Sequence, residues 1–395
     1  MLIYQLIYFF LSIGLITYLT KSKLVAFYFN DKNDEEPHKV HTSSVSRSGG
    51  IVFLLLGLTY FTIPLPHFDI IFYMYLFLLI GLAEDFFKNI NANKRFILIL
   101  ITSFVCVLDL KFTVDHVQIP YIDYYLENYP IISVLFTTLA LSVAINSYNL
   151  IDGFNGLVLG ISLIGFSIIC IVISIESGSS HYTSTSETNF NINLIYYIII
   201  SIFSILIFNF PFGKIFTGDG GAYAIGYLIG IISIMEFNNL DISAWFFAIV
   251  LCYPMIELFF SFCRRLFVYR KHAFSADLKH LHSMIFIILS NSKNNFLQKS
   301  ANYMTSIIIW IFYLIQVLPL IKIYEIDIFL KLQFLFCDFS ISSLAKSMHS
   351  FSNKLLPTSR PFAATNVLAI APPIIIISIF LSKKFITSIL VETFD

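Results

Sequence analysis

Charged residues are scarce in this sequence. Asp, Glu, Lys and Arg make up 12% of its 395 residues, whereas a soluble domain carries roughly 25%. The 24 basic and 24 acidic residues also cancel, which argues against a nucleic-acid-binding surface, so no nucleic-acid partner is expected. With 57% hydrophobic residues and a mean hydropathy of +0.82, the chain is predicted to be an all-α, polytopic integral membrane protein.

Cysteine is also sparse and has no metal-binding pattern. The five cysteines lie in or beside apolar runs, and no two of them form a CxxC pair. This spacing excludes a disulfide framework and a thiolate zinc site, and it predicts buried, inert thiols.

Long hydrophobic runs predict about 11 transmembrane helices, with 10 as the alternative, since a span needs about 20 apolar residues. The N-terminus lacks the basic residues and the small-residue cleavage site of a signal peptide, so the first run is expected to be retained. Residues 325–345 are ambiguous because Lys331 and Asp338 interrupt them. The expected spans are 2–20, 50–66, 69–84, 96–111, 130–147, 156–175, 192–210, 221–236, 243–262, 303–322 and 364–382.

Lys and Arg are distributed unevenly between alternate loops of this arrangement. The even-numbered loops up to residue 242 carry only Lys111, and the other loops carry the remaining basic residues of that region. The positive-inside rule then places the odd-numbered loops in the cytoplasm and the N-terminus outside. The last seventy or so residues do not fit this alternation.

The unusual polar residues fall in the five loops expected at the cytoplasmic face. Acids, amides, histidines and bases gathered at one membrane face predict a single active site built by several helix ends. In chain order these candidates are His41, Arg47, Glu84, Asp85, Lys94, Asn149, Asp152, Asn155, Lys214, Asp219, His280 and His282.

One stretch, Asn209–Tyr223, is especially rich in glycine. It holds four glycines, Lys214 and Asp219 between two apolar runs. Glycine lets backbone N–H groups approach a ligand closely, and an aspartate at the edge of a hydrocarbon layer needs a partner. A divalent metal bound to a phosphate is the predicted partner; a solvated loop that ends two helices is the alternative.

The residue types suit phosphoryl transfer. Carboxylate and amide oxygens of Asp85, Asp219 and Asn149 are ligands for magnesium or manganese, and cations and histidines suit phosphate oxygens. Positioning and charge neutralisation supply most of the catalysis in this chemistry. The expected substrates are a water-soluble phosphate donor and a lipid-borne acceptor.

Each motif also has a structural interpretation. Glu84-Asp85 could form an interfacial salt bridge, Asp152-Gly153 could be an ordinary turn, and the His280-x-His282 turn could be solvated. Glu257 follows Pro254 by three residues inside an expected span. We expect Glu257 to pair with one of the next arginines, Arg264 or Arg265, and to hold a bent helix.

Four of the motifs together resemble a known family. Gly81–Asp85, Asn146–Leu157, Asn209–Tyr223 and Asp277–His282 are similar, in order, to motifs of the polyprenyl-phosphate N-acetylhexosamine-1-phosphate transferases, the glycosyltransferase family 4 that includes the WecA and MraY enzymes. The resemblance implies a single transmembrane domain over 1–395, with its motif core at about 34–285 and poorly matched spans at 300–395. Glu84 stands where the family commonly has Asp.

The resemblance implies transfer of a sugar-1-phosphate, with N-acetylhexosamine expected, from a UDP-sugar to undecaprenyl or another polyprenyl phosphate. UMP is released, with Mg²⁺ (or Mn²⁺), and a cell-surface glycan such as O-antigen, capsule or wall polysaccharide is started at the inner (plasma) membrane. The alternative in the same class is the phospho-N-acetylmuramoyl-pentapeptide transferase step of peptidoglycan synthesis. A non-catalytic homologue or a transporter of lipid-linked sugars is the further alternative, and a homodimer stays open.

Residue roles follow from the same resemblance. Asp219 and Asn149 match metal positions, Asn155 matches a uracil-recognition position beside Asp152, and Lys94 matches a base near the pyrophosphate. His280 and His282 match phosphate- and sugar-side histidines, and Arg47, His41 and Lys214 are expected on the substrate side. Asp85, with Glu84, matches an acidic pair proposed as catalytic base. Because a phosphate monoester with a second pKa of about 6 is already ionised at neutral pH, we expect Asp85 mainly to organise the site.

Overall fold

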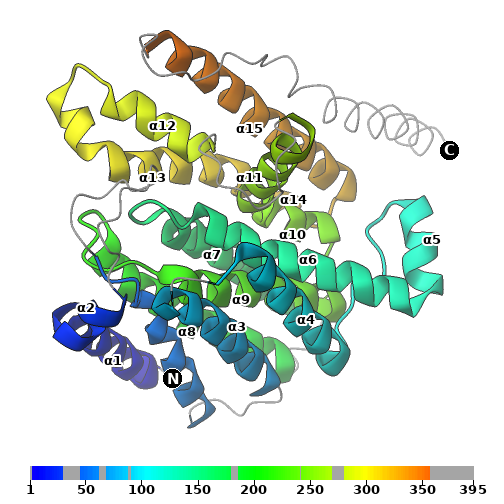
Figure 1. The fold of residues 1–395 in the computed structure, drawn as a ribbon. Helices are drawn as coiled ribbons and strands as arrows, with labels where there is room; N and C mark the ends of the chain where they lie inside the picture. Colours follow the sequence, from blue (N-terminus) through cyan, green and yellow to red (C-terminus); the bar gives the residue numbers. More distant parts are fainter. Residues whose placement is uncertain are drawn as a thin grey trace.

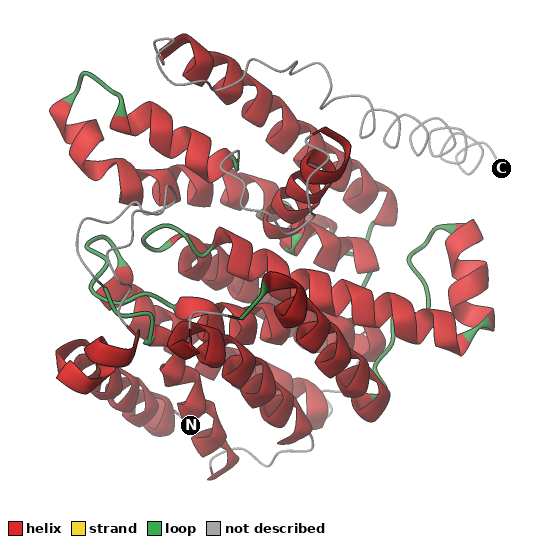
Figure 2. Cartoon of the chain, viewed as in Figure 1, coloured by secondary structure: helices red, strands yellow, loops and turns green. Residues whose placement is uncertain are grey.

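The computed structural model describes residues 2–29, 45–61, 68–87, 90–178, 186–240, 242–268 and 280–355. These parts are helices joined by short loops, and none of them forms a strand (Figure 2), so the all-α prediction is confirmed. The elements are α1 (Leu2–Lys21), α2 (Lys23–Phe29), the 3-10 helix η1 (Gly49–Phe61), α3 (Phe68–Phe87), α4 (Ala92–Leu110), α5 (Pro120–Asn128), α6 (Pro130–Ile151), α7 (Leu157–Gly178), α8 (Ser186–Asn209), α9 (Gly218–Leu240), α10 (Ala244–Val250), α11 (Cys252–Cys263), the π-helical turn η2 (Arg264–Val268), α12 (Leu281–Ser290), α13 (Asn295–Val317), α14 (Leu320–Ile323) and α15 (Asp327–Leu355).

Seven helices of the described residues are long and apolar enough to cross a membrane, or eight if the bent pair α10–α11 is one span. Large apolar side chains stay exposed on the outer helices, for example Phe10, Leu135 and Phe203, where lipid would cover them. The chain is therefore a multi-pass membrane protein. The helices of the described residues do not confirm the expected number of 11. The expected spans 50–66 and 96–111 correspond, where described, to η1 and α4, which are outside these seven, and 364–382 lies outside the described residues.

Helix α9 lies at the centre of the bundle, in contact with α3, α6, α7 and η1 (Figure 1). It is buried along nearly its whole length. Small residues allow this: a Cβ on Gly226 would stand 2.7 Å from the Ile145 Cα of α6, and one on Gly230 would stand 2.8 Å from Leu141 Cδ1. Spacing of small residues by four lets membrane helices approach closely.

The expected span 243–262 is broken into α10 and α11, which meet at 75°. Pro254 lies in the first turn of α11; it lacks an N–H, and its ring is incompatible with a helical bond to the carbonyl of Val250, four residues earlier. That carbonyl accepts instead from the Tyr313 hydroxyl of α13 at 2.5 Å. Pro254 therefore explains the break, and the Val250 carbonyl that the break frees still has a hydrogen-bond donor.

Helices α12, α13 and α15 form a second group, which contacts the central bundle through α7, α10 and α11 (Figure 1). The ambiguous stretch 325–345 is helical from Asp327 onward, within α15. Helices α5 and α12 are additional short helices that the apolar runs did not predict. The start of α12 carries the two candidate histidines, His280 as its N-cap and His282 in its first turn, so this group supplies one side of the site.

Candidate active site

Two acidic residues meet where α3 ends and α9 begins. Asp85 lies in the last turn of α3 and Asp219 in the first turn of α9. Gly81, one turn before Asp85, permits the approach, because a Cβ there would collide with the backbone of Asp219 and Gly220. The glycine of this motif therefore brings the two carboxylates together.

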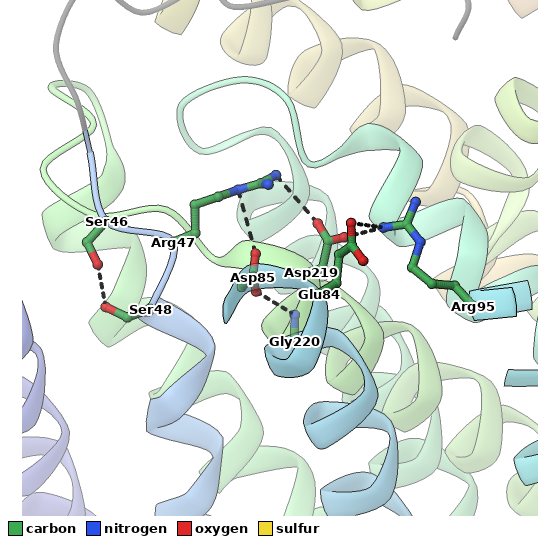
Figure 3. Close-up of polar contacts among 8 residues, drawn as sticks. All are labelled: Ser46, Arg47, Ser48, Glu84, Asp85, Arg95, Asp219 and Gly220. Atoms are coloured by element: carbon green, nitrogen blue, oxygen red, sulfur yellow. Dashed lines mark hydrogen bonds and ion pairs between the residues drawn. The ribbon is translucent and has the colours of Figure 1, made fainter. Parts of the chain in front are cut away.

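Two arginines join the acids (Figure 3). Arg95 Nη1 of α4 lies 2.6 Å from Asp219 Oδ2 and 3.6 Å from Glu84 Oε1. Arg47 Nη2 lies 3.4 Å from Asp219 Oδ1, and its Nε lies 3.7 Å from Asp85 Oδ1. Asp219 is thus held between two guanidinium groups, and the three acids and two arginines form one network.

Asp85 also anchors the start of α9. Asp85 is 1% exposed, and its Oδ2 accepts the Gly220 N–H at 3.1 Å. A carboxylate stabilises the free N–H groups at a helix N-terminus. The preceding Gly218 has φ +73°, and a Cβ on it would lie 2.7 Å from Asp85 Oδ2, so this turn requires glycine.

The segment before η1 positions Arg47. Its backbone pairs with the loop before α9: the Phe216 N–H donates to Ser46 O, and the Gly49 N–H donates to Phe216 O, each at 2.8 Å. Gly50 lies directly against Gly221. This pairing fixes Arg47 between the two acids, and the candidate substrate-side residue His41 lies outside the described residues.

A fourth carboxylate, Asp152, lies at the C-terminal end of α6. Burial raises its pKa to about 7; Arg47 opposes this shift, and Asp219 adds to it. Asn149, the other candidate metal ligand on α6, has a buried Nδ2 without a hydrogen-bond partner. Asp152 thus interacts with Arg47 and Asp219 from a third helix end, and Asn149 lies one turn earlier on the same helix.

Asn155 and Asn209 join the loops around the site. Asn155 Nδ2 donates to Pro211 O at 2.7 Å, and its N–H donates to Asn302 Oδ1 of α13 at 2.8 Å. Asn209 accepts from the Gly156 N–H and donates to Ile215 O. Contacts with backbone groups dominate, so the expected uracil role of Asn155 stays a prediction.

The candidate histidines are buried. His280 and His282 are 6% and 3% exposed, and their rings stack with centroids 5.1 Å apart. The solvated-turn interpretation is therefore wrong. Glu257 does not serve as predicted either: its Oε2 lies 3.1 Å from His280 Nδ1. His282 contacts Phe154 edge to face at 5.4 Å between centroids, which links the histidines to the loop of Asp152 and Asn155.

The bases differ from the sequence expectation in one respect. Lys94 and Lys214 are both exposed, whereas the neighbouring Arg95 enters the acidic network. The sequence showed Arg95 beside Lys94 but not which of them faces inward. The planar guanidinium of arginine suits paired carboxylates or phosphates better than a lysine ammonium does, and this preference could have pointed to Arg95 from the sequence.

The acids fit a divalent cation in their chemistry. In the described part of the chain, no three His, Cys, Asp or Glu side chains form an arrangement that could hold a metal by themselves. Carboxylate oxygens are nevertheless the donors that Mg²⁺ prefers, and the buried Asp85 Oδ1 has no hydrogen-bond partner. Asp219 and Asp85, with the amide of Asn149, are the residues that would hold the ion.

Comparison with known proteins matches the part of the chain that contains α3, α4, α6 and the start of α9. The model of "Glycosyl transferase family 4" matches residues 67–236. A probable undecaprenyl-phosphate N-acetylglucosaminyl 1-phosphate transferase of Bacillus subtilis is 28% identical over 218 residues, which cover 53% of this chain and 55% of the relative. The undecaprenyl-phosphate alpha-N-acetylglucosaminyl 1-phosphate transferase of Thermotoga maritima is 32% identical over 138 residues, 35% of this chain and 38% of the relative.

A second kind of relative also matches. The phospho-N-acetylmuramoyl-pentapeptide-transferase of Thermotoga neapolitana is 25% identical over 205 residues, which cover 50% of this chain and 63% of the relative. The chain spans about half the length of the curated relatives it matches. Residues 67–236, which the family model matches, include Glu84, Asp85, Arg95, Asp152 and Asp219.

Proposed function

Since residues 67–236 belong to glycosyl transferase family 4, we propose that the protein transfers a sugar-1-phosphate from a UDP-sugar to a polyprenyl phosphate and releases UMP. The expected sugar is an N-acetylhexosamine and the expected acceptor is undecaprenyl phosphate. Both relatives named as N-acetylglucosaminyl 1-phosphate transferases support this choice.

One observation carries the proposal: acids from α3, α9 and the end of α6 share two arginines at one end of the bundle. Bringing the phosphate acceptor next to a diphosphate requires local positive charge and fixed geometry. Arg47 and Arg95 supply guanidinium forks that match phosphate oxygens, and the carboxylates hold those forks in place. Asp152 interacts with Arg47 and Asp219 of this network from the end of α6.

In the proposed step, a phosphate oxygen of the lipid attacks the sugar-proximal phosphorus of the donor. A new P–O bond forms to the lipid phosphate, and the P–O bond to UMP breaks. The acceptor is already mostly ionised near pH 7 because its second pKa is about 6, so no strong base is required. Magnesium, when bound at Asp219 and Asp85, supplies neutralising charge for the diphosphate.

Asp85 then acts through its contacts. Its Oδ2 fixes the first turn of α9 through Gly220, and its Oδ1 faces Arg47. The N–H groups of that glycine-rich turn are suited to a phosphate, as at other helix N-termini. These contacts with Arg47 and Gly220 support the role of Asp85 as site organiser.

A donor panel tests the proposal. Purified protein would receive undecaprenyl phosphate with UDP-N-acetylglucosamine, UDP-N-acetylgalactosamine, a deoxy UDP-hexosamine or UDP-N-acetylmuramoyl-pentapeptide, each labelled in the sugar. We expect label in the lipid with one of the first three. Transfer from the muramoyl-pentapeptide alone would instead support the function named for the Thermotoga neapolitana relative, and transfer from none would contradict both.

The site is further proposed to face the cytoplasm, as the basic loops indicate. Lys214 lies beside the loop that follows the C-terminal end of α6, and Glu127 precedes the N-terminal end of α6; both side chains are exposed. In intact cells, an impermeant thiol reagent should label Glu127→Cys and not Lys214→Cys. Labelling of Lys214→Cys from outside would overturn this orientation.

A further inference from the structure

Helix α11 contacts both candidate histidines through residues one turn apart. The Tyr253 hydroxyl lies 3.1 Å from His282 Nδ1, and Glu257 Oε2 lies 3.1 Å from His280 Nδ1. Positions four apart share one face of a helix. One helix face therefore reaches the same nitrogen, Nδ1, on each ring.

The two rings are held from several sides. They lie nearly parallel, at an interplanar angle of 8°, and His282 also meets Phe154. Burial lowers the pKa of His282 to about 3, so this ring is neutral at pH 7. Anchoring Nδ1 leaves Nε2 of each ring as the nitrogen available to a ligand.

Glu257 determines where His280 carries a proton. Its Oε1 accepts the Leu281 N–H at 2.9 Å, and its Oε2 faces Nδ1 of His280. A carboxylate can only accept hydrogen bonds. The proton of this contact must therefore lie on His280 Nδ1.

We propose that Glu257 and Tyr253 are positioning residues, which fix the ring orientation of His280 and His282 and the proton on His280 Nδ1, so that both Nε2 atoms are presented to the donor. This inference rests on the proposed transferase function. Neither residue needs to touch a substrate: each acts through a histidine, as the outer partners of catalytic or metal-bound histidines do.

The substitution Glu257→Gln makes a sharp test because it inverts the contact. The Leu281 N–H still requires an acceptor, so the amide oxygen of the glutamine must face Leu281. Its NH₂ group then faces His280 and donates to Nδ1, which must lose its proton. We expect ¹⁵N-histidine NMR of the full chain in nanodiscs to show a protonated His280 Nδ1 in wild type and an unprotonated one in Glu257→Gln, with the signal assigned by its loss in His280→Gln.

Activity provides the second readout. Glu257→Gln and Tyr253→Phe should each lower kcat/KM by about 10- to 100-fold without lowering the amount of folded protein. Tyr8→Phe is the matched control, since Tyr8 is a buried tyrosine whose hydroxyl contacts Ser201 at 2.6 Å between α1 and α8. It removes a comparable hydroxyl and should leave kcat/KM within about twofold of wild type.

The outcomes separate this inference from the proposed function. Retention of the His280 Nδ1 proton in Glu257→Gln would overturn the inference whatever the enzyme does. An inverted proton in a variant with wild-type kcat/KM would overturn it too, because the histidine orientation would then be irrelevant to turnover. If wild type transfers no sugar phosphate while the NMR result is as expected, the proposed function fails and the proton assignment stands.

Discussion

Gly81→Ala tests how closely α3 and α9 must approach for the site to work. A Cβ at this position would stand 2.4 Å from both the Asp219 carbonyl carbon and the Gly220 nitrogen, where ordinary contact begins at 3.4 Å. These nearest atoms are backbone, so no side chain can rotate away, and the two helix ends must separate by about 1.0 Å. Asp85 and Asp219 lie on the two sides of this contact.

The expected cost has two parts. Overpacking of this kind destabilises a protein by about 1–3 kcal/mol. A misplacement near 1 Å between groups that position a reaction lowers its rate by about 10²-fold. Gly81→Ala should therefore remain folded, as judged by thermal unfolding, and should lose about two orders of magnitude in the initial rate of transfer to lipid.

Gly14→Ala is the matched control. Gly14 lies in α1, and no atom stands within 4 Å of a Cβ built on it. Alanine is favoured over glycine inside a helix, so this variant should equal wild type in rate and match or exceed it in stability. If the rate of Gly81→Ala stayed within about twofold of wild type, the reasoning that the close approach of α3 and α9 positions Asp85 and Asp219 for turnover would be refuted.

Three further predictions concern the charged groups. Arg95→Ala should lower the rate by about 10²-fold or more, the scale expected when one charge-stabilising donor is lost, while Lys94→Ala should stay within about twofold. Equal losses in side-by-side rate assays would contradict the assignment of Arg95 to the site. Asp85→Asn should lose rate by a factor nearly independent of pH between about 6.5 and 9, because the acceptor is its own anion there; a pH–rate profile that climbs towards wild type at high pH would favour a general base. The pKa of Asp152 is raised to about 7 in the folded protein, so the folded state retains a proton that the unfolded state loses at lower pH, and the stability of the fold falls as pH rises towards 7. The thermal unfolding midpoint of Asp152→Asn should therefore fall less than that of wild type between pH 5 and pH 8. Parallel falls of the two midpoints would contradict the raised pKa.

The sequence predicted the acids of the site better than their partners. Asp85, Asp219 and Asp152 occur at the ends of apolar runs, where a carboxylate is expensive without a function, and the structure places all three around one network. Which cation reaches them depends on the rotation of α4 about its axis, which fixes whether Lys94 or Arg95 faces inward. Asn93, Lys94 and Arg95 are all polar or basic, so the sequence at the start of α4 does not indicate which of them faces inward.

The error over Glu257 has a similar cause. Residues close in sequence, Arg264 and Arg265, were the natural partners for a carboxylate on the same bent helix. The bend at Leu251 and the return of the chain into α12 instead bring His280 to it. The break itself was predictable from Pro254, but the partner came from 23 residues further along the chain, and local spacing does not encode such a contact.

The most direct test of the central claim is the fate of the two phosphorus atoms of the donor. With the UDP-sugar that the panel identifies, labelled separately at the sugar-proximal and the uridine-proximal phosphorus, the account predicts that the first label enters the lipid and the second leaves as UMP. Asp219→Ala, which removes the carboxylate held between Arg47 and Arg95, should abolish both events. Release of UDP with neither phosphorus in the lipid would contradict sugar-1-phosphate transfer.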